Sequence, residues 1–456
     1  MPEIERRPRI PPGPYLVVGL ARSGQAAVTL LAGRGEQVIG IDAARPQGAE
    51  GLAGAGVEVI LDGDTIEPLE RVRCVVKSPG VPTDAAPVAV ARDRGLPVIG
   101  ELELAWRLLP NRFCAVTGTN GKTTVAELLG EVWRAAGEPV AVAGNVGTPL
   151  ASLPGTVAAE TTIVCEASSF QLEDSDAFAP ECGVLLNLSP DHLDRHAGLE
   201  PYLEAKLRIF RNQEKDDVCV YNGSDPALAG VELGGRGRRV AFCRDPGTSA
   251  PGDCFAVIES GVLSLRGEPL IETAELGLLG PHNADNAAAT AAAAAAMGIE
   301  PGAIATALRR FSGVPHRLER VGELAGVLYV HDSKATTVAA AAAALRSFDT
   351  GVHAILGGSR KGGGFAELAG AVAERCAACY LIGEAAEALE RDLEPAWDTG
   401  VARRRCAGLA AAVDAAAEAA RPGQVVLLTP ACASFDAYRD FEARGEHFRA
   451  LVGGRR

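Results

Sequence analysis

The sequence has no long apolar run. Its longest alanine-rich stretch, residues 287–297, falls short of the roughly 18 residues that suggest a membrane-spanning helix. The opening residues mix charge with proline and contain no apolar core, so a signal peptide is not expected there. These two absences predict a cytoplasmic protein without a membrane span.

The sequence also has fewer basic than acidic residues. Lys and Arg number 44 against 58 Asp and Glu, which gives a formal net charge of −14. A uniformly basic surface for nucleic acid is therefore not expected. Local arginines and lysines can still serve one site, so an anionic small-molecule substrate stays compatible with the composition.

The eleven cysteines show no pairing pattern. Most lie in apolar, strand-like runs, as Cys114, Cys165 and Cys182 do, which favours buried free thiols over a disulfide framework. Cys376 and Cys379 form a single CxxC with no second pair and no nearby histidine, so zinc or redox chemistry is not expected.

Short β-branched runs alternate with alanine-rich helical stretches along the whole chain. Continuous apolar runs between helices are typical of strands buried on both faces, which predicts an α/β protein with mainly parallel sheets. The candidate strands are residues 15–20, 37–42, 72–78, 112–118, 162–168, 183–189, 352–358, 379–384 and 424–430.

Two breaks divide the chain into three predicted domains. Pro110 and Asn111 precede one strand, and a helix ends near residues 312–315. The expected domains are residues 1–110, 111–313 and 314–456, of which the first and last are Rossmann-like and the middle one resembles a phosphate-loop ATPase. Residues 230–272 are rich in Gly, Pro and short β runs, which predicts additional antiparallel strands in the middle domain.

The segment TGTNGKTT, residues 117–124, joins a strand to an amphipathic helix, as a phosphate-binding loop requires. Gly118 and Gly121 let backbone N–H groups approach phosphate oxygens, and the helix N-terminus adds its positive dipole. Lys122 can reach the β- and γ-phosphates, and the Thr123 hydroxyl can bind Mg²⁺. The usual first glycine of such loops would fall at Val116, so a tighter loop is expected; an ordinary strand–helix turn is the alternative.

Acidic and imidazole side chains follow two later strands. Glu166 ends one strand, and Asp191 and His192 follow the next. A carboxylate at a strand end beside a phosphate loop suits a Mg²⁺ ligand, whereas a lone loop histidine is more often structural.

The first domain carries a near-match to a dinucleotide-binding fingerprint. Gly19 and Gly24 follow the first strand, Asp42 ends the second, and Ala21 stands where the second glycine would be. The pattern suits NAD or UDP, since both pair a pyrophosphate with a ribose. A tight turn without a ligand is the third interpretation.

A short Asp-x-Lys unit follows a strand of the third domain. Asp332 can accept ribose hydroxyls, and Lys334 can neutralise charge on a transferred phosphoryl group. A surface salt bridge is the alternative interpretation.

TGTNGKTT resembles the signature of the Mur ligases and the folylpolyglutamate synthases, which use ATP to join a carboxylate to an amine. The segments HDSKAT, LGGSRKGGGF and TPACASFDAYRDFEARG (residues 331–336, 356–365 and 429–445) resemble the Mur ligase branch that adds D-glutamate. The resemblance extends from Gly19 to Phe448. It implies a monomeric ligase of cell-wall precursors whose substrates are ATP, with Mg²⁺, UDP-N-acetylmuramoyl-L-alanine and D-glutamate.

The resemblance also implies roles for individual residues. ATP is assigned to Gly118, Thr119, Asn120, Gly121, Lys122, Thr123, Thr124, Asn286 (at the adenine), Arg317 and Asp332, and the uridine nucleotide substrate to Arg22, Ser23, Asp42, Ser78, Asn145 and Ser168. The D-glutamate pocket is assigned to Thr336, Lys361, Ser434 and Phe441, catalysis to Lys122, His192, Lys206 and Lys334, and Mg²⁺ to Thr123, Glu166, His192 and a carbamate on Lys206. The chain departs from the branch's pattern at Thr337, where an Asn is expected, and at Ser359 and Arg360, where Asp-Gly is more usual.

Lys206 lies in a segment, residues 202–210, that reads as a helix. On the sequence alone, a solvated lysine that pairs with Glu204 is as good an interpretation as a carbamylated metal ligand.

Two other functions stay open. A folylpolyglutamate synthase would lack a separate UDP-binding domain, whereas about 110 residues precede this phosphate loop. A catalytically silent nucleotide-binding partner would be expected to lose Lys122, Glu166, His192 or Lys334, and all four are present.

Overall fold

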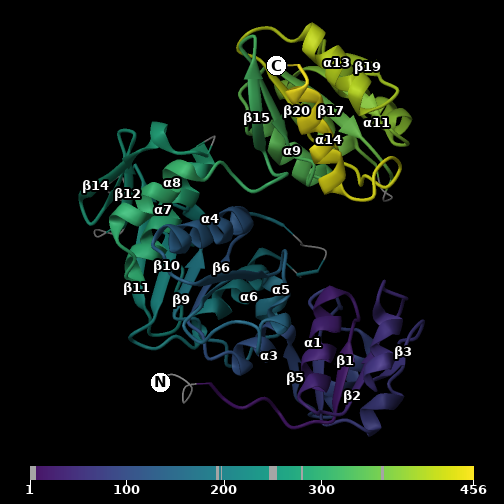
Figure 1. The fold of residues 1–456 in the computed structure, drawn as a ribbon, viewed down its shortest axis with the longest axis vertical. Helices are drawn as coiled ribbons and strands as arrows, with labels where there is room; N and C mark the ends of the chain where they lie inside the picture. Colours follow the sequence, from purple (N-terminus) through teal and green to yellow (C-terminus); the bar gives the residue numbers. More distant parts are fainter. Residues whose placement is uncertain are drawn as a thin grey trace. The chain divides into compact units, whose positions relative to one another are not determined.

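The computed structural model describes residues 7–191, 195–196, 198–245, 254–278, 281–360 and 364–455. One compact unit extends to Phe311, and a second begins at Ser312. The chain forms three α/β domains with separate sheets, two in the first unit and one in the second (Figure 1). No helix within the described ranges combines the length and apolarity needed to cross a bilayer.

The N-terminal domain is a parallel sheet of five strands in the order β3-β2-β1-β4-β5. Its strands are β1 (Tyr15–Val18), β2 (Val38–Ile41), β3 (Glu58–Ile60), β4 (Cys74–Lys77) and β5 (Val98–Gly100), and its helices are α1 (Arg22–Gly33), α2 (Ala86–Asp93) and α3 (Glu101–Leu108). Strands β1, β2 and β4 are buried along their whole length, as the continuous apolar runs predict.

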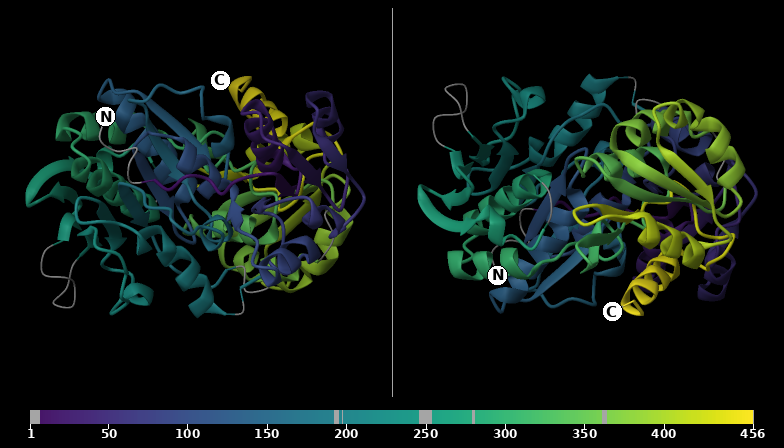
Figure 2. Two further views of the ribbon diagram at one scale, coloured as in Figure 1. Left: turned by 90° about the horizontal axis from the view of Figure 1, so that it is seen from below. Right: turned by 90° about the horizontal axis from the view of Figure 1, so that it is seen from above.

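The central domain is a sheet of nine strands in the order β14-β13-β12-β11-β10-β9-β6-β8-β7, whose β12–β14 end is teal in Figures 1 and 2. Its strands are β6 (Phe113–Thr117), β7 (Val140–Gly144), β8 (Thr162–Glu166), β9 (Cys182–Leu185), β10 (Val218–Asn222), β11 (Arg238–Arg244), β12 (Cys254–Glu259), β13 (Val262–Leu265) and β14 (Glu268–Glu272). Its helices are α4 (Lys122–Ala135), α5 (Ser169–Glu173), α6 (Leu199–Arg211), α7 (Pro281–Ala296) and α8 (Pro301–Arg310).

One prediction about this domain is confirmed in part, and another needs correction. The pairs β12–β13 and β13–β14 are antiparallel, as residues 230–272 predict, whereas β10–β11 and β11–β12 are parallel. Cys243 and Cys254 form a disulfide, because the pairing of β11 with β12 brings their Cα atoms to 6.0 Å. The other described cysteines are free thiols, and most of them are buried.

The C-terminal domain has six strands in the order β15-β16-β20-β17-β18-β19, parallel except for the β15–β16 hairpin. Its strands are β15 (Glu319–Leu324), β16 (Val327–His331), β17 (Val352–Gly357), β18 (Cys376–Ile382), β19 (Ala402–Arg405) and β20 (Val425–Leu428). Its helices are α9 (Val338–Arg346), α10 (Ala369–Arg375), α11 (Ala386–Asp392), α12 (Glu394–Trp397), α13 (Leu409–Ala419) and α14 (Phe441–Gly453). The order β19-β18-β17-β20 is the Rossmann arrangement, which places functional loops at the carboxyl ends of the strands.

Buried ionic contacts join the first two domains. The Lys77 ammonium, at the end of β4, lies 2.6 Å from the Asp174 carboxylate that follows α5, and both side chains are almost fully inaccessible to solvent. Arg92 reaches the other oxygen of Asp174 at 3.1 Å. Glu101 accepts a hydrogen bond from the backbone N–H of Ala151 at 2.6 Å. These contacts fix the loop after β4 relative to α5.

Candidate active site

The segment predicted to be a phosphate loop forms a turn between β6 and α4, as expected. Gly118 and Gly121 have φ values of +151° and +85°, which side chains rarely adopt. A Cβ atom at Gly121 would lie 2.4 Å from Oδ1 of Asn286. Val116, where a longer loop would have its first glycine, is a buried residue of β6. The turn is therefore the tight one that the sequence predicts.

Asn286 packs directly against this loop. It is 94% buried, and its amide donates to the side chain of Asn283 at 2.9 Å. Helix α7 begins at Pro281, so Asn286 lies inside the helix and does not cap it.

Asn187, two residues after β9, is hydrogen-bonded to the same loop. Its side chain accepts the N–H of Asn120 at 2.9 Å and donates to the Asn120 carbonyl at 3.1 Å. The Thr119 hydroxyl donates to the carbonyl of Ser189 at 3.2 Å. The loop is thus fixed next to the N-terminus of α4, whose helix dipole favours an anion.

Two lysines converge on the loop. Lys122 donates to the carbonyl oxygens of Gly118 and Thr119, each at 2.9 Å, and Lys206 donates to the Gly118 carbonyl at 2.9 Å. Lys206 is 1% exposed on α6, so the interpretation as a solvated surface lysine is wrong. Burial, together with the nearby positive charge of Lys122, lowers the pKa of Lys206 to about 7, although Asp191 opposes the shift.

Glu166 lies where the metal ligand is expected. It ends β8, is 3% exposed, and receives one side-chain hydrogen bond from the described residues, from the Asn145 amide at 3.0 Å. A buried carboxylate with only a neutral partner retains acceptor capacity for a cation. Thr123 is buried in the first turn of α4. His192 lies outside the described residues.

Three residues predicted to contact the uridine nucleotide lie shortly after strands β1 and β2 of the N-terminal domain. Arg22 and Ser23 open α1, and Arg22 donates to the carbonyl of Gly147, two residues after Asn145. Asp42 accepts the N–H groups of Leu20 at 2.6 Å and Ala44 at 2.8 Å. Arg22, Ser23 and Asp42 therefore lie at the carboxyl ends of the neighbouring strands β1 and β2.

Two of the predicted nucleotide contacts also have structural roles. The Ser78 hydroxyl donates to the carbonyl of Gly19 at 2.7 Å, which fixes the turn after β1. Ser168 is the N-cap of α5 in a capping box with Gln171. Both side chains are nearly buried.

In the C-terminal domain, the structure brings Asp332, Arg317 and Lys334 together. Burial raises the pKa of Asp332 to about 6, and the positive charges of Arg317 and Lys334 partly oppose that shift. The Lys334 N–H donates to the carbonyl of His316 at 3.1 Å. Thr337, where the branch pattern has Asn, caps α9 by accepting the N–H of Ala340 at 3.3 Å, a role that either residue fills.

The predicted D-glutamate residues lie at neighbouring strand ends. Thr336 follows β16, and Ser434 follows β20 and is 2% exposed. Phe441 begins α14 and contacts the His316 ring edge-to-face at 6.1 Å. Lys361 lies outside the described residues. Phe435, next to Ser434 in the sequence, is an exposed aromatic residue, with 72% of its side chain accessible.

One histidine–carboxylate cluster lies near these loops. His316, Glu319 and His331 place potential ligand atoms within 4.8 Å of one another. However, Arg449 contacts both Glu319 oxygens, at 2.8 and 3.1 Å, and the backbone N–H of His316 donates to one of them at 2.8 Å. Burial alone would raise the pKa of Glu319, but the hydrogen bonds from His331, His316 and Arg449 lower it to about 2. The Glu319 carboxylate is therefore ionised and already paired with Arg449.

Three family models match consecutive parts of the chain. Residues 14–100 match the Mur ligase MurD-like N-terminal domain, residues 116–294 the Mur ligase middle domain, and residues 316–432 the Mur ligase glutamate ligase domain. A UDP-N-acetylmuramoylalanine–D-glutamate ligase of Pelotomaculum thermopropionicum is 43% identical over 448 residues, which cover 96% of each chain. A ligase of the same name from Geobacter metallireducens is 41% identical over 444 residues, again 96% of each chain.

Solved structures share the fold at lower identity. The UDP-N-acetylmuramate–alanine ligase MurC of Thermotoga maritima superposes with a TM-score of 0.58 at 18% identity, covering 97% of this chain and 100% of that chain. FolC of E. coli, in complex with DHPP and ADP, gives a TM-score of 0.53 at 18% identity, covering 77% of this chain and 91% of that chain.

Proposed function

The chain belongs to the Mur ligase family, and from that premise we propose that it joins D-glutamate to UDP-N-acetylmuramoyl-L-alanine while ATP is cleaved to ADP and phosphate. The observation that carries the proposal is the full-length similarity to D-glutamate ligases, over 96% of both chains. The product is a precursor of peptidoglycan. We place the reaction in the cytoplasm, where ATP and nucleotide-linked precursors are available, and assign it to a monomer.

The reaction has two chemical steps. The γ-phosphoryl group of ATP moves to the terminal carboxylate of the L-alanine residue, which gives an acyl phosphate and ADP. The amine of D-glutamate then attacks the carbonyl carbon, loses a proton, and phosphate leaves as the amide forms. No covalent bond to the protein is needed, so its residues act by positioning and by stabilising charge.

We assign residues 1–110 to the uridine nucleotide substrate, 111–313 to ATP, and 314–456 to the amino acid. Arg22, Ser23, Asp42 and Ser78, with Asn145 and Ser168 of the central domain, would bind the nucleotide-linked substrate. The contact between Arg22 and the Asn145 loop supports this grouping, since both come from loops that the structure brings side by side.

In the ATP site, Lys122 would exchange its bonds to the loop carbonyls for bonds to phosphate oxygens. Backbone N–H groups at the N-terminus of α4, residues 121–124, would donate to the same phosphates. Asn286 would contact the adenine, an assignment supported by its packing against Gly121. Arg317 and Asp332 would bind the remainder of the nucleotide, and Lys334 would stabilise the phosphoryl group during transfer.

The residues present fit Mg²⁺, because Glu166 is a buried carboxylate with acceptor capacity to spare. Thr123, Glu166, His192 and a carbamate on Lys206 would hold it. Mg²⁺, when bound, would neutralise phosphate charge. The lowered pKa of Lys206 supplies the neutral amine that reacts with CO₂, and the resulting carbamate replaces a repulsive ammonium by an oxygen ligand.

Thr336, Lys361, Ser434 and Phe441 would bind D-glutamate. A lysine and two hydroxyls suit two carboxylates, and fixing both carboxylates selects one hand of the α-carbon. A folylpolyglutamate synthase activity has weaker support: FolC shares the fold at 18% identity, whereas the relatives at 38–43% identity are named as D-glutamate ligases.

Phosphate release tests the proposal. The purified chain is incubated with ATP, Mg²⁺ and UDP-N-acetylmuramoyl-L-alanine, and D-glutamate, L-glutamate, L-alanine and diaminopimelate are added one at a time. Of the four amino acids, only D-glutamate is expected to cause phosphate release. This release should disappear when UDP-N-acetylmuramoyl-L-alanine is left out. Comparable turnover with L-glutamate, above all on a folate acceptor, would favour the folylpolyglutamate alternative.

A further inference from the structure

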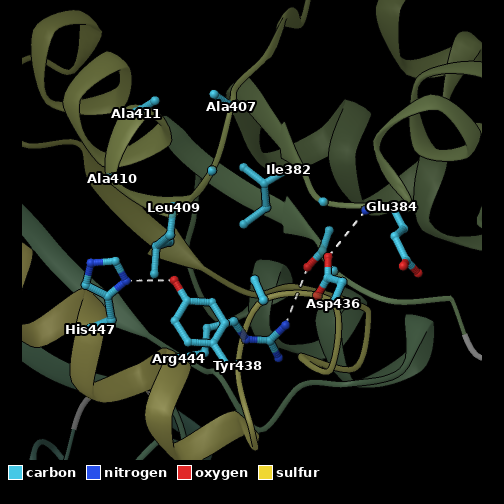
Figure 3. A pocket seen from close by; sticks show the side chains of 15 residues that line it. Ile382, Glu384, Ala407, Leu409, Ala410, Ala411, Asp436, Tyr438, Arg444 and His447 are labelled. Atoms are coloured by element: carbon cyan, nitrogen blue, oxygen red, sulfur yellow. Dashed lines mark hydrogen bonds between the residues drawn. The ribbon is translucent and has the colours of Figure 1, made fainter.

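Arg444 is a buried cation in the C-terminal domain. It lies in the first turns of α14 and is 1% exposed. Burial lowers the pKa of its guanidinium to about 10, an effect that Cys432 and Asp436 partly oppose, so the side chain stays charged at neutral pH. Figure 3 shows it near Asp436 and Tyr438, at the wall of a cavity of about 620 Å³.

All five N–H groups of Arg444 are engaged. Nε donates to the Ser333 hydroxyl at 3.0 Å, and one terminal nitrogen donates to the carbonyls of Ser333 and Cys432 at 3.0 and 3.1 Å. The other terminal nitrogen donates to the carbonyls of Ala433 and Gly357 at 3.0 and 3.5 Å. A guanidinium has five such donors, so none is left for a substrate.

These bonds tie together the segments after three parallel strands. Ser333 follows β16, Gly357 ends β17, and Cys432 and Ala433 follow β20. The Ser333 hydroxyl donates in turn to the carbonyl of Phe441 at 2.7 Å, which connects the start of α14 to the same group.

The backbone at Gly358 allows the close approach of Ala433 and Arg444. Gly358 has a φ of +141°, and a Cβ atom there would lie 2.1 Å from the Ala433 carbonyl and 3.0 Å from the guanidinium. The segments after β17 and β20 can therefore approach Arg444 together only with glycine at this position.

We infer that Arg444 is a positioning residue for the amino-acid pocket: it holds Thr336, Ser434 and Phe441 in their binding geometry without touching the substrate. This inference rests on the proposed function. Three of the segments lie within three residues of a pocket residue: Ser333 before Thr336, Ala433 before Ser434, and Phe441 in the α14 turn that carries Arg444. The fourth, at Gly357, lies four residues before Lys361 in the sequence. A lysine offers three donors from a single point and cannot span the same acceptors.

The test compares two nucleophiles for the same acyl phosphate. D-glutamate needs the pocket, whereas hydroxylamine attacks the acyl phosphate from solution and does not. Phosphate release is measured with each nucleophile for the wild type, Arg444→Lys and Arg444→Met. Arg439→Lys is the matched control, because Arg439 is 83% exposed and only five residues away.

We expect Arg444→Lys to raise KM for D-glutamate at least tenfold while hydroxylamine-dependent release stays within about twofold of the wild type. Arg444→Met should not saturate with D-glutamate, and Arg439→Lys should behave as the wild type. Unchanged D-glutamate kinetics in Arg444→Lys would overturn the inference, as would an equal loss with both nucleophiles, which indicates general structural damage. A wild-type chain that uses hydroxylamine but not D-glutamate would instead refute the proposed substrate, and with it this assignment.

Discussion

The amino groups of Lys122 and Lys206 share one acceptor, the carbonyl oxygen of Gly118, at 2.9 Å each. Lys122 comes from the phosphate loop, and Lys206 comes from α6, 84 positions further along the chain by residue number. Two ammonium groups on one carbonyl repel each other, and Lys206 is also buried. Its neutral form is therefore favoured, which is what carbamylation requires.

Lys206→Ala is expected to be nearly inactive. The variant loses the carbamate oxygens proposed to hold Mg²⁺, and a small added carboxylate such as acetate should restore part of the activity by occupying the space. Phosphate release with and without acetate measures this, with chloride at equal ionic strength as the control. Full activity of Lys206→Ala without acetate would show that the lysine is not part of the metal site.

Lys206→Met should stabilise the folded chain at neutral and acidic pH. The pKa of Lys206 is about 7 in the folded protein against an ordinary 10.5, so between these values the unfolded chain binds the extra proton and wild-type stability rises with pH. The stability gain of the variant over the wild type is thus largest below pH 7, of the order of a few kcal/mol, and shrinks towards pH 10. Denaturant unfolding of both proteins at pH 6 and pH 9.5 in CO₂-free buffer tests this prediction. A difference in free energy of unfolding between variant and wild type that does not change with pH would contradict it.

Lys122→Ala should abolish turnover while the fold survives. Loss of one fixed donor to developing charge costs roughly 2.7–4 kcal/mol, or about 10²–10³ in rate. The measurement is phosphate release, with circular dichroism and thermal unfolding as checks on folding. Wild-type turnover by a folded Lys122→Ala chain would refute the phosphate-loop assignment.

Lys77→Met should destabilise the chain by about 3–5 kcal/mol, because it leaves the buried Asp174 carboxylate without its closest partner. Arg92, which keeps its contact at 3.1 Å, should hold the loss near the lower end. The double variant Lys77→Met/Asp174→Leu should regain much of the stability. Arg94→Met is the control, because its pair with Glu70 is exposed and should contribute under about 1 kcal/mol. Equal effects of Lys77→Met and Arg94→Met in denaturant unfolding would contradict the argument.

The chain should bind UDP and not NAD. Ala21 stands where the dinucleotide fingerprint has its second glycine, and a Cβ atom at Gly24 would lie 1.8 Å from the Gly19 carbonyl oxygen, so the turn after β1 requires Gly24. Gly24→Ala should therefore eliminate UDP binding, and Gly33→Ala, where a Cβ atom meets nothing within 4 Å, should not. Calorimetry with both nucleotides measures this; tight NAD binding without UDP binding would overturn the assignment of the first domain.

Local patterns in the sequence determined much of this protein. Each of the nine candidate strands corresponds to a strand of the structure, because strands buried on both faces need continuous apolar runs. The tight turn between β6 and α4 was also predicted from the sequence, since its glycines, lysine and threonines lie within eight consecutive residues. Strand direction was predicted only in part, because side-chain alternation is the same in parallel and antiparallel strands: β12–β13 and β13–β14 are antiparallel as expected, but β11 is parallel to both of its neighbours.

Only the tertiary structure decided which distant residues meet. Lys77 reaches Asp174 across 97 positions and Arg444 reaches Ser333 across 111, and no periodicity in the sequence relates either pair. The burial of Lys206 is of the same kind, since a lysine on a helix has the same local sequence whether its face is covered or solvated. Residue spacing determines which side chains share a face of one helix or strand, but the order of strands in the sheet determines what that face contacts, and through burial and neighbouring charge it sets each group's chemistry.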